Sequence, residues 1–292
     1  MKDYLVKALG YDGTVRAYAI SSTNTVQEAA TRQGSSRTVT AALGRSLTAG
    51  VMMGAMLKGE EKITIKIEGN GPASPIVIDA NSKGQVRGYV KNPQVEADRK
   101  VNGKLNVSAV VGESGSLSVV KDLGLKDFFT GSVPLVSGEI AEDFTYYFAR
   151  SEQTPSSVAL GVHFEEGEKV AAAGGFILQM MPGVTDETIE DLEEKLKSLP
   201  PVSQLIKEGL SPEEILQRVI GTNQLQILDT LDVEFKCNCS RERISNGIIG
   251  LGSAEIKEMI AEDGGAETQC HFCNEIYNFS KDDLENLLKE TK

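Results

Sequence analysis

Several sequence patterns that carry enzyme chemistry are missing from this 292-residue chain. It has no G-x-x-x-x-G-K-[ST] or G-x-G-x-x-G loop for phosphates, no G-x-S-x-G nucleophile motif and no H-E-x-x-H metal motif. Only two histidines are present, so a histidine-assisted nucleophile would have to use His163 or His271. We expect His163 to be an ordinary residue of a strand, and His271 to be a neighbour of a metal site rather than a ligand. The sequence therefore does not predict an enzyme.

Long apolar runs and an excess of positive charge are missing as well. The most apolar helical stretch, residues 47–57, has about half the length that a membrane span needs, and the charged residues 1–7 lack the pattern of a signal peptide. Residues 1–182 contain 19 basic and 19 acidic side chains, whereas residues 183–292 contain 11 and 23. An acidic chain of this kind repels nucleic acid and anionic membranes. We expect a cytoplasmic protein that binds neither.

Cysteine is scarce, and its distribution is uneven. All four cysteines lie in one short segment, as Cys237-x-Cys239 and Cys270-x-x-Cys273. Alternate side chains of an extended segment share a face, and a C-x-x-C turn brings its two sulfurs together. Four sulfurs from two close pairs suit a tetrahedral zinc ion. The alternative, two structural disulfides, requires an oxidising compartment, whereas cytosolic thiols stay reduced. The sequence predicts one Zn²⁺ bound by these four thiolates in the reduced protein.

The first part of the chain has the pattern of a mixed α and β domain. Short strand-like runs are separated by glycine, asparagine and proline, and helical patterns lie among them. The helix expected at residues 36–57 has an apolar stripe typical of a core helix, although its methionines leave a methionine-lined binding surface as an alternative. Ser151–Ser156 is expected to be a turn. The predicted strands are residues 4–9, 14–20, 62–67, 75–79, 85–91, 105–111, 116–120, 157–164 and 169–180, and the other predicted helices are residues 25–33 and 140–150.

The sequence changes character near Pro182-Gly183. Three short amphipathic helices are expected, the first capped by Thr185 or Asp186 and the third by Ser211 followed by Pro212. Short isolated helices are marginal in water and need an apolar surface to persist. We interpret this region as a helical linker whose order depends on what it lies against. The helices are expected at about residues 184–196, 202–208 and 212–220.

The tail that carries the cysteines is too small to fold securely by itself. A domain of about sixty residues gains only ~3–5 kcal/mol from its core, whereas a structural zinc ion supplies ~10–16 kcal/mol of binding free energy coupled to folding. Loss of the metal should therefore unfold the tail. Its expected core residues are Ile244, Ile248, Ile249, Leu251, Ile256, Met259, Ile260, Phe272, Ile276, Tyr277, Phe279, Leu284, Leu287 and Leu288.

These parts predict an α+β protein with three regions. A core domain of mixed or antiparallel sheet with flanking helices is expected over residues 1–182, a helical linker over 183–231 and a small zinc-binding α+β domain over 232–292. Oxidants attack thiolates, so oxidation would remove ligands, release zinc and unfold the tail. On spacing alone, the sequence favours a purely structural zinc module, since most closed four-ligand sites are structural.

A family resemblance adds to this interpretation. The two cysteine pairs, Ser151-Glu152-Gln153 with Pro155, and the segment from Gly174 to Gly183 resemble the 33 kDa chaperonin (heat-shock protein 33) family over essentially the full chain. The resemblance implies a holdase chaperone that is inactive when reduced and zinc-bound. Oxidation would form the disulfides Cys237–Cys239 and Cys270–Cys273, unfold the tail and linker, and expose apolar surface for unfolding client proteins without ATP.

The resemblance also implies a homodimer in the oxidised form. Two other functions remain open on the sequence. One is a constitutive zinc-binding module that binds a protein partner. The other is a thiol–disulfide oxidoreductase using Cys270 and Cys273, which would need the βαβ context of a thioredoxin-like domain.

Overall fold

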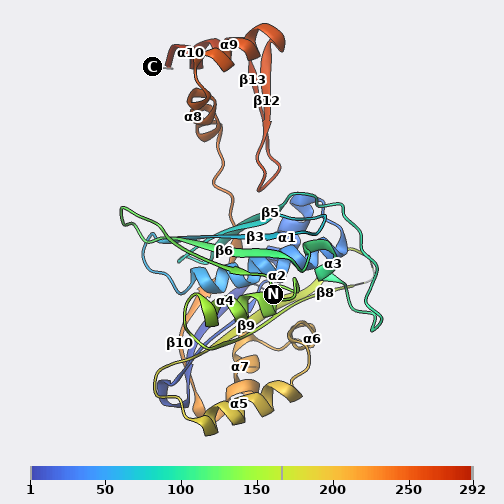
Figure 1. Cartoon of the computed structure of the whole chain (residues 1–292), viewed down its shortest axis with the longest axis vertical. Helices are drawn as coiled ribbons and strands as arrows, with labels where there is room; N and C mark the ends of the chain where they lie inside the picture. The colour runs from blue at the N-terminus through green and yellow to red at the C-terminus, as the bar shows by residue number, and fades with distance from the viewer. Residues whose placement is uncertain (1, 166, 291–292) are drawn as a thin grey trace. The chain divides into compact units, whose positions relative to one another are not determined.

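The protein folds into two compact units, and the boundary between them along the chain falls between Lys236 and Cys237. The computed structural model describes residues 2–165 and 167–290. The first unit contains two β-sheets and seven of the described α-helices, and the second contains a β-hairpin and three helices (Figure 1). This is the mixed α+β class expected from the sequence. None of the described helices is long and apolar enough to cross a membrane.

A five-stranded sheet, here called the first sheet, is antiparallel throughout. Successive side chains of a strand point to opposite faces of the sheet, and here each face packs against a different hydrophobic cluster. On β1 and β2, Leu5, Tyr18 and Ile20 face one side, whereas Val6 and Ala17 face the other. Both faces are therefore covered. The strand order is β10 (Leu225–Asp232), β1 (Tyr4–Gly10), β2 (Val15–Ser21), β9 (Val170–Met180) and β8 (Ser156–Phe164).

The second sheet has six strands and leaves one face to solvent. On β3, Ile63, Ile65 and Ile67 are buried, whereas the alternate residues Lys66 and Glu68 are exposed. The pairing is antiparallel except for the short β11, which runs parallel to β5. The order is β11 (Glu234–Phe235), β5 (Gln85–Val90), β4 (Ile76–Asn81), β3 (Lys62–Gly69), β6 (Gly115–Asp122) and β7 (Phe129–Pro134).

A layer of helices lies between the two sheets (Figure 1). Its centre is α2 (Arg37–Gly54), which is buried on nearly all sides and packs closely because it contains glycine: a Cβ on Gly50 would lie 2.7 Å from Ile78. The prediction of a core helix is confirmed. The alternative of a methionine-lined binding surface is wrong, because Met52 and Met53 are 0% and 3% exposed. Beside α2 lie α1 (Thr23–Gln33) and α4 (Ala141–Arg150).

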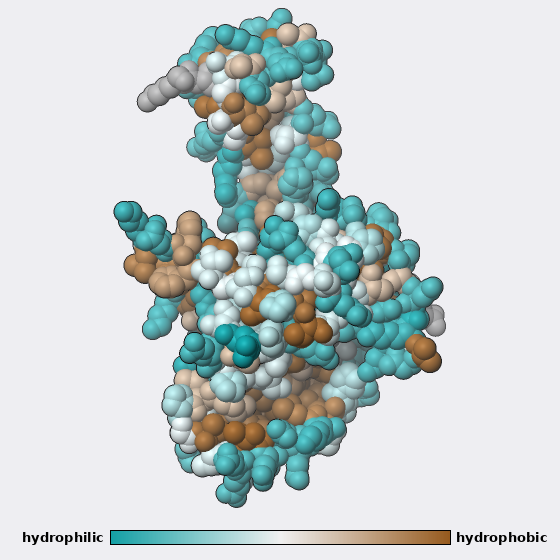
Figure 2. Space-filling model, viewed as in Figure 1, coloured by the Kyte–Doolittle hydropathy of each residue, from teal (hydrophilic) through white to brown (hydrophobic). Residues whose placement is uncertain are grey.

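The other face of the first sheet is covered by the three helices predicted for residues 183–231. They are α5 (Asp186–Ser198), α6 (Val202–Lys207) and α7 (Pro212–Ile220). Thr185 and Ser211 cap α5 and α7 through their side-chain oxygens, as expected. The outward side of α5, at the bottom of Figure 2, is hydrophilic, and an apolar strip lies above it. The residues that these helices bury are Leu192, Val202, Leu205, Ile215, Leu216, Val219 and Ile220.

Three elements of the first unit differ from the sequence prediction. Residues 105–111, expected as a strand, contain the short helix α3 (Val107–Val111). Their valines favoured a strand, but the segment packs against α2 as a single turn, and its carbonyls accept hydrogen bonds from Gly71 and Ala73. The strands β7 and β10 were not predicted. Residues 151–155 connect α4 to β8, which agrees with the predicted turn.

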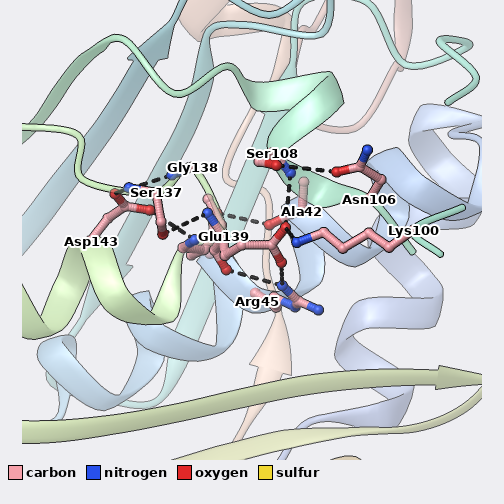
Figure 3. A network of polar contacts seen from close by, with 11 residues as sticks. Ala42, Arg45, Lys100, Asn106, Ser108, Ser137, Gly138, Glu139 and Asp143 are labelled. Atoms are coloured by element: carbon pink, nitrogen blue, oxygen red, sulfur yellow. Dashed lines mark hydrogen bonds and ion pairs between the residues drawn. The ribbon is translucent and has the colours of Figure 1, made fainter. Parts of the chain in front are cut away.

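A polar network fixes the loops around α3 and α4 (Figure 3). The carboxylate of the buried Asp143 accepts hydrogen bonds from the backbone N–H groups of residues 136, 137, 138 and 140. Glu139 bonds Arg45 at 2.9 Å and Lys100 at 2.6 Å, and accepts a bond from the backbone N–H of Ser108. Because these donors come from four separate segments, the network holds the inner helix layer to the loops at its end.

The second unit has a much smaller core. It consists of α8 (Arg241–Leu251), α9 (Ser253–Glu262), the hairpin β12 (Gly265–Gln269) and β13 (Ile276–Ser280), and α10 (Lys281–Glu290). The prediction of the tail's core is wrong at two positions, because the side chains of Leu251 and Ile276 are 53% and 51% exposed. They lie at the end of α8 and at the first position of β13, outside the packed centre. The buried apolar residues that form the core of the described tail are Ile248, Ile256, Phe279 and Leu284.

Candidate metal centre

The four cysteines come from two different kinds of local structure. Cys237 and Cys239 lie in an irregular segment directly after β11, and Cys270 and Cys273 lie in the turn that joins β12 to β13. In that turn, the Cys270 N–H donates to the Glu275 carbonyl at 2.9 Å, and the Asn274 N–H donates to the Cys270 carbonyl at 2.8 Å. Asn274 has a φ of 59°, which asparagine tolerates better than most residues. The turn therefore presents two sulfurs to the segment that carries the other two.

The four sulfurs converge in one place. All lie within 4.8 Å of one another, with 3.7 Å between the Sγ atoms of Cys237 and Cys270 and 3.2 Å between those of Cys239 and Cys273. None is in a disulfide. A tetrahedral ion with metal–sulfur bonds of 2.3 Å requires edges of about 3.8 Å between sulfurs. The donor set and its spacing fit a single four-coordinate metal ion.

The two histidines do not join this cluster. His271 lies in the same turn but is exposed, and its ring is not among the ligand atoms that converge. His163 lies on β8 in the first unit, in the strand predicted for it. Within the described part of the chain, the converging group is made of the four cysteines alone.

The sulfurs differ in how readily they lose a proton. Burial raises the pKa of Cys237, but the backbone N–H of Cys239 and the neighbouring thiols outweigh it and lower this pKa to about 7. Burial raises the pKa of Cys239 and, more strongly, that of Cys273. Several thiolates so close together repel one another, so full deprotonation needs a cation among them. This is the electrostatic condition of a metal-binding site.

Residues outside the cysteine pairs hold the cluster in place. Tyr277 on β13 donates its hydroxyl to the Cys239 Sγ at 3.2 Å, which raises the pKa of the tyrosine because the sulfur is its acceptor. Arg243 donates to the carbonyl of Asn238 at 3.0 Å. Arg241 donates to the Asn278 carbonyl at 2.7 Å and pairs with Asp283 at 3.0 Å. Their contacts with the cluster were not predicted from the sequence, although Tyr277 was expected in the core of the tail; a tyrosine in the strand after the C-x-x-C turn was the available signal.

Comparison with known proteins identifies the family. The family model described as "Hsp33 protein" matches residues 3–280. The chain belongs to the Hsp33 family. It is 59% identical over 288 residues to the 33 kDa chaperonin of Bacillus pumilus, covering 99% of both chains. It is 57% identical over 287 residues to that of a Geobacillus species, covering 98% of this chain and 97% of the relative.

A solved structure agrees with this assignment. The crystal structure of the 33 kDa chaperonin of Thermotoga maritima matches with a TM-score of 0.93 at 38% identity, and the match covers 99% of each chain. The resemblance seen in the sequence is therefore confirmed, and so is the α+β fold. Hsp33 proteins are named as chaperonins, which are not enzymes, in agreement with the absence of enzyme motifs.

The oxidoreductase alternative meets a structural obstacle. A thioredoxin-like site needs a βαβ unit, whereas the described part of the tail combines one antiparallel hairpin with three helices. The C-x-x-C pair of this Hsp33 protein lies instead in the hairpin turn, beside two further thiols.

Proposed function

We propose that this protein is an ATP-independent holdase chaperone that is inactive when reduced and is activated by oxidation of its cysteine cluster. The observation that carries the proposal is the convergence of four thiols in a unit with only four buried apolar residues in its described core. In the reduced state, Cys237, Cys239, Cys270 and Cys273 would hold one Zn²⁺, the ion that a closed four-thiolate site favours. Bound zinc would supply most of the folding free energy of this unit.

The chemistry of activation is a two-electron oxidation of each cysteine pair. A peroxide oxidises one thiolate to a sulfenic acid, and the partner thiol then displaces water to form the disulfide; two thiols and one peroxide give one disulfide and two waters. The family resemblance assigns the disulfides Cys237–Cys239 and Cys270–Cys273. In the folded site, close sulfur contacts also join opposite pairs, at 3.7 Å between Cys237 and Cys270 and at 3.2 Å between Cys239 and Cys273. Pairing within each motif would replace these contacts, which loss of the metal would allow.

The apolar surface that activation would expose lies under α5–α7. These helices cover one face of the first sheet, including Val6, Ala17, Ala19, Phe176 and Leu178, which are all at most 1% exposed. Burying such residues stabilises a protein by about 1.5–3 kcal/mol each for the larger side chains, so an uncovered face would bind other apolar chains. Three regions would carry these roles. The core domain would provide the sheet face, the linker would cover it, and the switch domain would bind the metal; they are residues 1–182, 183–231 and 232–292.

The partners follow from this function. Clients would be unfolding proteins that present apolar segments, and the oxidised form would associate as a homodimer, as the family resemblance implies. The acidic composition, with a net charge of −12, disfavours nucleic acid and anionic membranes. We place the protein in the cytoplasm, where the reduced state of the thiols would be maintained between oxidative episodes.

One experiment tests the proposal. Zinc content, free thiols and light scattering of a chemically denatured client are measured together, before and after peroxide treatment at elevated temperature. We expect four thiols and one zinc to be lost together and the client to stay in solution. Reduced protein, and reduced protein treated with a chelator alone, serve as controls. Oxidised, zinc-free protein that leaves client aggregation unchanged would contradict the proposal, and zinc that survives oxidation would favour a constitutive zinc-binding module.

A further inference from the structure

A cavity of about 1050 Å³ lies beside β8 in the first unit. Its walls come from separate segments: α2 contributes Arg37 and Arg45, α6 contributes Lys207, and the loop after β5 contributes Arg99 and Lys104. One carboxylate oxygen of Glu139 pairs with Arg45 and the other pairs with Lys100 (Figure 3). Nothing in the metal centre or in the proposed redox switch uses this cavity.

The cavity reaches the open edge of a sheet. In the described structure β8 is the last strand of the first sheet and pairs only with β9. Consecutive residues of β8, from Ala159 to Phe164, line the cavity. Since neighbouring side chains of a strand point to opposite faces, the cavity wraps around the strand's edge. An edge strand carries backbone N–H and C=O groups that another extended chain can bond.

The walls are strongly cationic in a protein that is acidic overall. Five basic side chains line the cavity, and Glu208 is the one carboxylate among its described lining residues. The whole chain has a net charge of −12. Burial lowers the pKa of His163, and the charges of Lys207 and Arg37 lower it further, so positive groups face one another here. Such a concentration of like charge is costly without an anionic ligand.

Two of the arginines have unused hydrogen-bonding capacity. The Nε atoms of Arg37 and Arg45 are buried and have no partner among the described residues. Buried donors without a partner cost about 1–3 kcal/mol each, and native proteins contain few of them. The guanidinium fork matches a carboxylate in a bidentate geometry. Carboxylates entering the cavity would therefore offset the charge of the guanidinium groups that line it.

We propose that this cavity binds an extended acidic peptide segment, which adds as a strand to the free edge of β8. Side chains on one face of the segment would lie on Leu160 and Val162, those on the other face would lie on Leu199, and its carboxylates would meet the basic residues. A second copy of this chain fits less well, because a symmetric interface would place the same cationic patch on both sides. A small anion would leave most of the volume empty. The site exists with α6 folded, so this inference concerns the reduced protein and stands apart from the oxidative activation.

The test uses the full-length, reduced, zinc-loaded protein and fluorescence anisotropy. The probe is a labelled eight-residue peptide of alternating valine and glutamate. It is compared with a valine–lysine peptide and with an acidic peptide that carries proline at alternate positions, which cannot form strand hydrogen bonds. We expect binding of the first peptide alone, and weaker binding at higher salt.

Two substitutions and a control locate the site. Arg37→Gln and the surface substitution Lys207→Gln should each weaken binding of the acidic peptide by about tenfold, the effect of one lost charged hydrogen bond. Lys126→Gln, an exposed residue outside the cavity lining, should leave it unchanged. Because Lys207 is exposed, its variant tests the site even if Arg37→Gln misfolds.

Several results would overturn the proposal. Equal binding of the lysine peptide would rule out charge recognition, and equal binding of the proline peptide would rule out strand addition. Absence of binding would show that the basic residues only protect the edge strand from aggregation. Tripolyphosphate that binds while the peptide does not would make the cavity an anion site, and self-association that Lys207→Gln abolishes would make it a dimer interface.

Discussion

The two units of this Hsp33 protein maintain their folds in different ways. The first buries a helix between two sheets and covers a further sheet face with three more helices. The second has four buried apolar residues in its described core and a separate cluster of four cysteines. A core that is large enough persists without help, whereas a small one depends on a ligand. From this contrast we expect folding that depends on a ligand to begin in the second unit, which carries the cysteines.

The largest effect is expected from removing the metal. Treatment of the reduced protein with a zinc chelator should withdraw ~10–16 kcal/mol of binding free energy from the tail, which its small core cannot replace. Hydrogen exchange should then show loss of amide protection in α8–α10 and the hairpin, with β2 and β3 still protected. Cys273→Ser should behave in the same way. If the amides of the tail stayed protected from exchange without metal, the tail would fold without a ligand, and the proposed difference in stability between the two units would be contradicted.

The next effect concerns the helices that cover the first sheet. Leu216 on α7 is 0% exposed, so Leu216→Ala should lower the free energy of unfolding by about 2–5 kcal/mol. Leu228→Ala, at a leucine of β10 that is 54% exposed, should cost much less. Urea denaturation measures both. If hydrogen exchange shows that α5–α7 lose amide protection before α2 and the two sheets, these helices resemble the tail in stability and the contrast between the two units becomes sharper. Equal losses of unfolding free energy for the two leucine variants would contradict the prediction.

A smaller effect is expected at Asp143. Its carboxylate accepts four backbone hydrogen bonds at the entrance to α4, so Asp143→Asn should cost about 1–3 kcal/mol by leaving some of these N–H groups unpaired. Glu142→Gln, at the exposed neighbouring position, is the matched control. Thermal unfolding of the first unit should shift for the first variant only. The metal content of the tail should not change, since the network belongs to the first unit.

The smallest effect is a dependence on pH. Burial raises the pKa of Glu139, but its ion pairs with Lys100 and Arg45 outweigh this and lower it below the ordinary value of 4.5. A lowered carboxyl pKa stabilises the fold above the unfolded pKa, and this stabilisation is lost as the pH falls through the folded pKa. We expect about 1 kcal/mol from this source. Glu139→Gln should reduce the change of the urea midpoint below pH 4.5, and an unchanged pH profile would contradict the assignment.

The parts of the fold that follow local patterns could be predicted from the sequence. The cap at Ser211, the buried α2 and the alternating residues of β3 depend on neighbours within a few positions. Four cysteines in two motifs likewise indicated their convergence. In contrast, α3 is a helix because of what surrounds it, although its valines favour a strand. Local propensity is weak where tertiary packing decides.

Features that join distant segments were not predictable. The residues of β10 are mostly exposed and show no clear alternation, so only their pairing with β1 makes them a strand. The hydrogen bond from Tyr277 to Cys239 joins positions 38 residues apart. The cationic cavity combines Arg37 with Lys207 from the far side of the first sheet. Such contacts depend on chain topology, which composition and spacing do not record.

The position of β10 limits how the covering helices can be released. It pairs with β1, and β9 pairs with β2, so the 44 residues between Met180 and Leu225 form a loop with both ends fixed in one sheet. Closing a loop of that length costs ~3 kcal/mol of chain entropy. If the three helices unfolded while both ends of the loop stayed paired, the unfolded loop would still bear this cost. Detachment of β10, a solvent-exposed edge strand, together with the short β11 that pairs with β5, would free one end and recover that entropy. Chain connectivity thus couples the release of three helices to the loss of β10 and β11.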